Sequence, residues 1–182
     1  MNIDEKIALA GVIVSAFGFA VLIFQLFHGL RLMRSEKIAR IYSELHQVHH
    51  AFVEYPELRP FFFHKVSLSS PPEGDHTSDD ALLYYRARAI AEMFFDVFEH
   101  IFILKAETKS PILDDLTQAP TNIDESFEAY IQNTLSGSEF ISAYMMEVND
   151  STYPEGLARL VRVTVLREWP EVFAQYRNNG NA

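Results

Sequence analysis

The sequence predicts an all-α protein in which one N-terminal transmembrane helix precedes a compact domain of about five to six helices. Three observations predict this. An apolar run without Asp, Glu, Lys or Arg extends from Ile7 to Leu30, a basic cluster follows it directly, and helix-period apolar patterns fill the remainder. We expect four parts: a short tail with the transmembrane helix, a juxtamembrane amphipathic helix, a helical domain and a frayed tail. These parts span residues 1–33, 34–55, 56–177 and 178–182.

The apolar run is long enough to cross a bilayer. A helix needs about 20 apolar residues to span the hydrocarbon core, and a helix satisfies all of its backbone groups in lipid. A cleaved signal peptide is a poorer interpretation, because the leading residues Asp4, Glu5 and Lys6 are not a basic n-region. A buried core helix would normally carry a polar face, which this segment lacks.

Basic residues set the expected orientation. One lies before the apolar run, and four lie just after it: Arg31, Arg34, Lys37 and Arg40. The positive-inside rule therefore predicts a single-pass signal anchor in the cell membrane. The N-terminus would lie outside the cell and the helical domain in the cytoplasm.

The charge of the domain excludes one class of partner. From Ile41 onward the chain has 10 Lys and Arg against 22 Asp and Glu. Such a domain would be repelled by phosphate backbones, so we exclude nucleic-acid binding as the main role. The chain has no cysteine, which excludes disulfides, thiolate metal sites and thiol catalysis.

Small residues recur on one face of the apolar run. Gly11, Ser15 and Gly18 follow a helical spacing, and small residues at such spacing let membrane helices approach closely. These residues are candidates for packing against a second membrane helix, and the competing interpretation is that small residues are common in membrane spans. An oligomeric membrane effector or pore built on the same face is an alternative.

The remaining chain reads as a series of helices. The first covers about residues 35–55, with an apolar stripe, and is either continuous with the span or broken near Ser35. Pro56 should end it, and a short helix follows around Phe61–Phe63. After a loop at 67–78, longer helices are expected at about 78–109, 121–135, 139–148, 154–168 and 170–176.

Histidine and acidic residues raise the question of a metal site. His46 and His50 lie four residues apart on the first helix of the domain, and Asp96 and His100 share that spacing on the long helix. Two facing helices with such rows suit a metal ion. The competing interpretation is a solvated polar face with an Asp96–His100 pair, because His46 and His50 point away from the apolar stripe. We favour the polar face and expect no metal or other cofactor.

No reaction motif is present. Nucleophile elbows, glycine-rich phosphate loops and His-Glu-x-x-His are all lacking. We therefore interpret the chain as a membrane-tethered, non-enzymatic module for protein–protein interaction or signalling, whose partners are the lipid bilayer and a protein or a second copy. A metal-dependent membrane enzyme that uses the His and carboxylate rows is the alternative.

The layout resembles uncharacterised bacterial single-pass membrane proteins of the domain-of-unknown-function type. The resemblance rests on the N-terminal anchor with its basic exit from Arg31 to Arg40, on the phrase EYPELRPFF at Glu54–Phe62, and on the aromatic-rich long helix. It implies a membrane-tethered helical domain and transfers no catalytic residue.

Overall fold

The computed structural model describes residues 3–71, 74–108, 122–148 and 153–178, which contain helices and no strand. The long helices are α1 (Ile3–Glu54) and α3 (Asp79–Thr108). A 3₁₀ turn η1 (Pro56–Leu58) and the short α2 (Arg59–Phe63) connect them. The remaining helices are α5 (Asn122–Gly137), α6 (Glu139–Val148), α7 (Glu155–Glu168) and α8 (Pro170–Asn178). The predicted all-helical class is confirmed.

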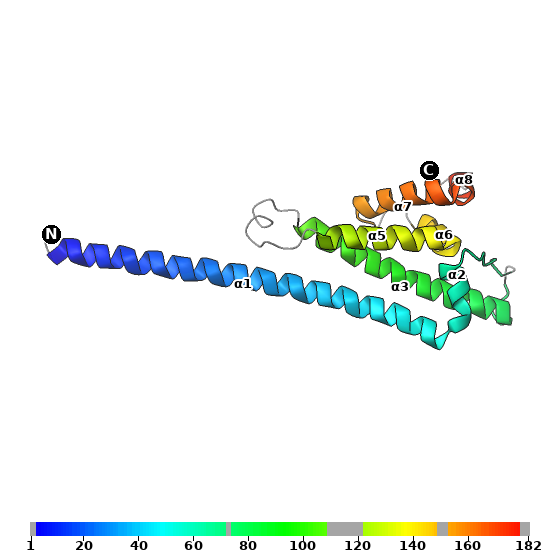
Figure 1. Cartoon of the computed structure of the whole chain (residues 1–182), viewed down its shortest axis with the longest axis horizontal. Helices are drawn as coiled ribbons and strands as arrows, with labels where there is room; N and C mark the ends of the chain where they lie inside the picture. The colour runs from blue at the N-terminus through cyan, green and yellow to red at the C-terminus, as the bar shows by residue number, and fades with distance from the viewer. Residues whose placement is uncertain (1–2, 72–73, 109–121, 149–152, 179–182) are drawn as a thin grey trace.

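Helix α1 is continuous over 52 residues. Figure 1 shows it as one long rod, with the described helices of the bundle gathered beside its C-terminal half. Ser35 lies inside the helix without a break, which settles the question that the sequence left open. At about 1.5 Å per residue the rod is about 78 Å long.

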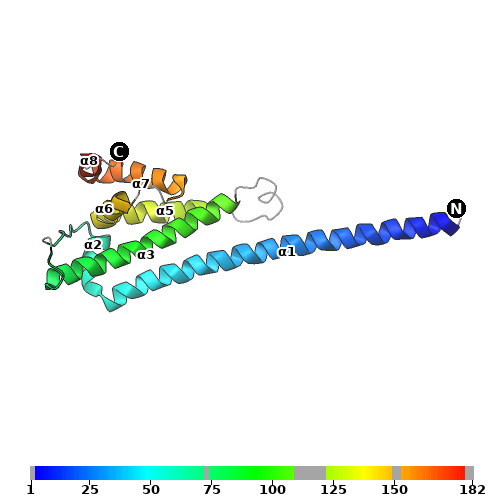
Figure 2. The same ribbon diagram turned by 180° about the vertical axis from the view of Figure 1, so that it is seen from behind.

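Helix α3 is the central element of the bundle. It runs antiparallel to α1, and both views place it between α1 and the pair α5 and α6 (Figures 1 and 2). Helices α7 and α8 form the outer layer, and α7 also contacts α3. The nearly uniform apolar character of α3 is explained by this position, because neighbours cover it on several sides.

An aromatic cluster fills the core where α1, α2 and α3 meet. Phe52, Phe62, Phe94 and Phe98 are all buried. The Phe52 and Phe62 rings meet edge to face at 5.0 Å, and the Phe62 and Phe94 rings are 6.0 Å apart. Such ring pairs add about 0.5–1.5 kcal/mol each beyond the burial of their area.

Two serines cap the starts of helices. The Ser78 Oγ accepts a hydrogen bond from the Ala81 amide and so caps α3. The Ser138 Oγ accepts one from the Ile141 amide and donates another to the Phe61 carbonyl. Ser138 therefore caps α6 and joins it to α2.

Helix boundaries agree with the expectations to within a few residues. Helix α5 continues to Gly137 rather than ending near Leu135, and α8 reaches Asn178. The predicted start at residue 121 and the rest of the frayed tail, 179–182, lie outside the described residues. The run VRVTVL at 161–166, which is rich in β-branched residues, is helical and lies within the helix expected at about 154–168.

Candidate functional site

The apolar half of α1, defined here as residues 11–30, is largely exposed. Every residue from 11 to 26 is exposed, and the exposed fractions of Val14, Phe17 and Phe24 are 70%, 73% and 72%. Among the described residues, α1 is the one helix that is long and apolar enough to cross a membrane, by length and composition. The most apolar stretch of this helix is not buried at all inside the protein.

Among the described residues, the small side chains of this half lie open. A Cβ atom added at Gly11 or Gly18 would have no atom within 4 Å, and Ser15 is exposed. The face that the sequence singled out is therefore open for contact along its length.

The four basic residues lie on α1 between the apolar half and the bundle. Arg31 and Lys37 are exposed and Arg34 is half-buried. Arg40 pairs with Glu44, one turn along the same helix, through its Nε at 2.9 Å. These four side chains recur at every third position of the helix, and we call them the basic collar.

The candidate metal ligands do not lie together. His46 and His50 are exposed, as their position opposite the stripe predicts, and Asp96 is exposed on α3. In the described parts of the chain, no group of three His, Asp or Glu side chains is placed to hold an ion. His100 pairs with Glu44 of α1 rather than with Asp96.

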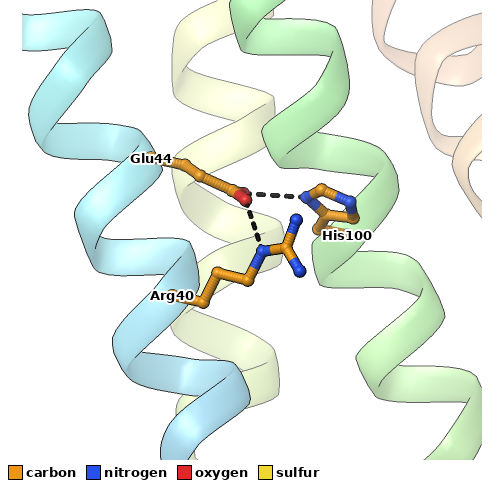
Figure 3. A network of polar contacts seen from close by, with 3 residues as sticks. All are labelled: Arg40, Glu44 and His100. Carbon is orange, nitrogen blue, oxygen red and sulfur yellow. Dashed lines mark hydrogen bonds and ion pairs between the residues drawn. The ribbon is translucent and has the colours of Figure 1, made fainter.

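Glu44 joins α1 to α3 through a three-residue network (Figure 3). Its Oε2 lies 2.8 Å from the Nδ1 of His100, and its Oε1 accepts a hydrogen bond from the Nε of Arg40 at 2.9 Å. Burial opposes ionisation of this carboxyl, but the hydrogen bonds from His100 and Arg40 outweigh it. The pKa of Glu44 is therefore lowered from its ordinary value.

We call the network of Arg40, Glu44 and His100 the clamp, because it links α1 to α3. A carboxylate on the Nδ1 of a histidine also occurs in catalytic triads, where the other ring nitrogen activates a hydroxyl. Within the described residues, no hydroxyl forms a hydrogen bond with His100. The arrangement holds two antiparallel helices in register at one point.

A second ion pair between helices escaped the sequence analysis. Arg88 of α3 donates from both terminal nitrogens to Glu147 of α6, at 3.1 and 2.8 Å, and lies over the Tyr144 ring. The hydrogen bonds to Glu147 raise the pKa of Arg88, although partial burial opposes the shift. The partners are far apart in sequence, and no local pattern links them.

Comparison with known proteins identifies no relative of the chain. No family model, no curated protein and no solved structure matches the chain.

Proposed function

We propose that the chain is a membrane-tethered helical module for protein–protein interaction, with the apolar half of α1 as its anchor. One observation carries this proposal. Along α1, the most apolar stretch is exposed, whereas the less apolar C-terminal stretch is buried against the bundle. Removal of apolar surface from water is favourable by about 25 cal/mol per Å². A helix half that stays exposed in the folded monomer gains this free energy in lipid.

We further propose that the bundle lies on the cytoplasmic side. The basic collar supports this orientation, because Lys and Arg next to a span favour the cytoplasmic side. The chain has no cysteine, so a single one at exposed Ser69 gives a clean probe. A membrane-impermeant maleimide should label Ser69→Cys only after the cells are opened. Labelling of intact cells would overturn the orientation.

Membrane fractionation tests the anchor itself. The full-length chain should remain with membranes after alkaline carbonate extraction and should float with lipid vesicles in a density gradient. Recovery of the chain in the soluble fraction without detergent would overturn the proposal.

The first partner to test is a second copy of the chain. The open face at Gly11, Ser15 and Gly18 supports this choice, because small residues permit close helix contact. Chemical cross-linking in membranes should give a dimer that Gly11→Ile with Gly18→Ile removes. Ala16→Ile with Ala20→Ile, on the opposite face, is the matched control. Equal dimer in both double variants would exclude this face.

A further inference from the structure

Two histidines of α1 lie on a face that the described part of the bundle leaves uncovered. His46 and His50 are exposed and lie one turn apart, whereas the apolar stripe from Ile41 to Phe52 is buried against the bundle. At about 100° per residue, the histidine pair is turned about 150° away from that stripe. Figures 1 and 2 agree with this position, because both show α1 at one edge of the bundle.

The histidines continue the spacing of the small residues in the apolar half. His46 lies five heptads after Gly11, and His50 lies five heptads after Ser15. Two helices that wind around each other as a left-handed coiled coil keep positions seven residues apart on one line of contact. We call this line the seam. A second copy that packs on Gly11 and Ser15 therefore meets the first helix again at the histidines.

The seam between its two ends suits a second helix. A Cβ atom added at Gly29 would have no atom within 4 Å, and Ala39 and Ser43, just before the histidines, are short and exposed. Short side chains let two helices approach closely. Leu32 suits a core position of a coiled coil, and Glu36 is the one charged residue of the seam. A charged residue at a single core position lowers stability but helps to fix the register.

The histidine pair has the chemistry of half a zinc site. Two histidines one turn apart on a helix can bind the same metal ion. Zinc in structural sites takes four ligands, and the neutral imidazole is among those that it prefers. Within the described residues, one chain offers no group of three His, Asp or Glu placed to hold an ion. A parallel dimer with two-fold symmetry brings the same pair from each copy and completes a set of four.

The position of the pair relative to the bilayer leaves it accessible to dissolved ions. At about 1.5 Å per residue, His46 is about 24 Å beyond Leu30, where the apolar half ends. The polar layer of a bilayer is only about 5–8 Å deep on each side. If the apolar half is the anchor, the histidines therefore lie in water on the same side as the bundle.

We propose that the α1 helices of two copies pair in parallel along the seam, and that His46 and His50 of both copies together bind one zinc ion. The inference rests on the self-association proposed above. It deepens that function by adding a metal-dependent contact outside the membrane. Contact between imidazoles and water is lost as the helices close, and the ion replaces it, since a buried polar group without a partner is costly. Zinc thereby fixes the two bundles relative to each other.

Zinc titration of the full chain, purified in detergent without a polyhistidine tag, tests the inference. One ion should bind per two chains, and native mass spectrometry should show it on the dimer. His46→Ala and His50→Ala should each abolish this stoichiometric binding. His49→Ala removes an exposed imidazole of the same helix that is outside the seam, and it should bind zinc as the wild type does. Circular dichroism should show the same helix content in all three variants, because the three side chains are exposed.

Zinc should also strengthen the dimer. An ion that binds the dimer but not the single chain raises the association constant about 100-fold when its free concentration is about 100 times its dissociation constant. Analytical ultracentrifugation in detergent, with zinc and with a chelator, measures this shift. His50→Ala should remove the shift, and His49→Ala should keep it.

The outcomes separate this inference from the proposal on which it rests. A dimer that forms equally with zinc and with the chelator, or one ion bound per chain, overturns the shared zinc site and leaves self-association standing. Equal zinc binding by His49→Ala and His50→Ala also overturns the site, because the ion would then not follow the seam. A wild-type chain that stays monomeric in both conditions overturns both.

Discussion

The two halves of α1 belong to one uninterrupted helix and have opposite relations to the rest of the molecule. In the apolar half, residues 11–30, large apolar side chains such as Phe17 and Phe24 are exposed. In the packed half, residues 38–54, apolar residues lie at helical spacing and are buried against the bundle: Ile41, Leu45, Val48 and Phe52. Helix propensity does not distinguish the halves, but the placement of polar residues does.

This difference shows what determines burial along a helix. The packed half alternates an apolar stripe with polar residues such as His46 and His50, so that one face suits the bundle and the other suits water. The apolar half has no polar face, and its residues 11–26 are all exposed. A helix that is apolar on all sides suits a uniformly apolar surrounding, whereas the packed half suits a boundary between the bundle and water.

The largest expected effect comes from charge in the apolar half. Val14→Lys with Phe17→Lys should release the chain from membranes, because each buried lysine costs about 2.5–3.5 kcal/mol in a membrane helix. The matched control is Tyr42→Lys with Val53→Lys, which changes two exposed side chains of the packed half. Flotation in a density gradient measures both. If both variants were released from membranes to the same extent, the apolar half would not be the part of α1 that binds the membrane.

The next effect is on the stability of the bundle. Phe52→Ala removes a ring that is 3% exposed and should lower the free energy of unfolding by about 3–5 kcal/mol. Phe24→Ala makes the same change in the apolar half and should leave bundle unfolding unaltered. Thermal unfolding in detergent, followed by circular dichroism, compares them. A similar loss in both variants would mean that the bundle also packs on the apolar half.

Local signals account for most of the fold. The hydroxyl of Ser78, the turn at Ser138 and the proline at position 56 each act within a few residues, so helix ends follow from the sequence. The stripe from Ile41 to Phe52 correctly indicates the buried face of α1. What packs on that face depends on chain topology, and a single helix pattern has no information about it.

The polar contacts between helices show the limit of local reasoning. The sequence suggests Asp96 as the partner of His100, because the two are one turn apart. In the structure, His100 instead pairs with Glu44, which is 56 positions away in the sequence. The i,i+4 rule identifies neighbours on one helix, whereas the register of α1 against α3 is set by the apolar residues between them. Arg88 and Glu147 escaped prediction for the same reason.

A break in α1 at residue 35 should uncouple the apolar half from the packed half while both remain helical. Ser35→Pro costs about 3 kcal/mol of helix stability at a position outside the core. Membrane flotation and thermal unfolding should both stay close to wild type. Spin labels at Ser15→Cys and Ser69→Cys should give a broader distance distribution in the proline variant, because the rod is then jointed. An unchanged distribution would show that other contacts fix the bundle relative to the apolar half.

The smallest expected effect lies in the clamp between α1 and α3. Glu44→Gln should lower the free energy of unfolding by less than about 1 kcal/mol, because Arg40 and His100 are partly exposed and solvent screens the pair. The pKa of Glu44 is lowered in the folded protein. Its contribution is therefore present above the ordinary value of 4.5 and is lost as the pH falls through the lowered value.

The stability difference between wild type and Glu44→Gln should accordingly shrink as the pH is lowered from neutral into the acid range. Thermal unfolding of both proteins at a series of pH values measures this difference. A difference that grows on acidification would contradict the sign of the shift. In that case the ionised carboxylate would not be the form that holds the packed half of α1 against α3.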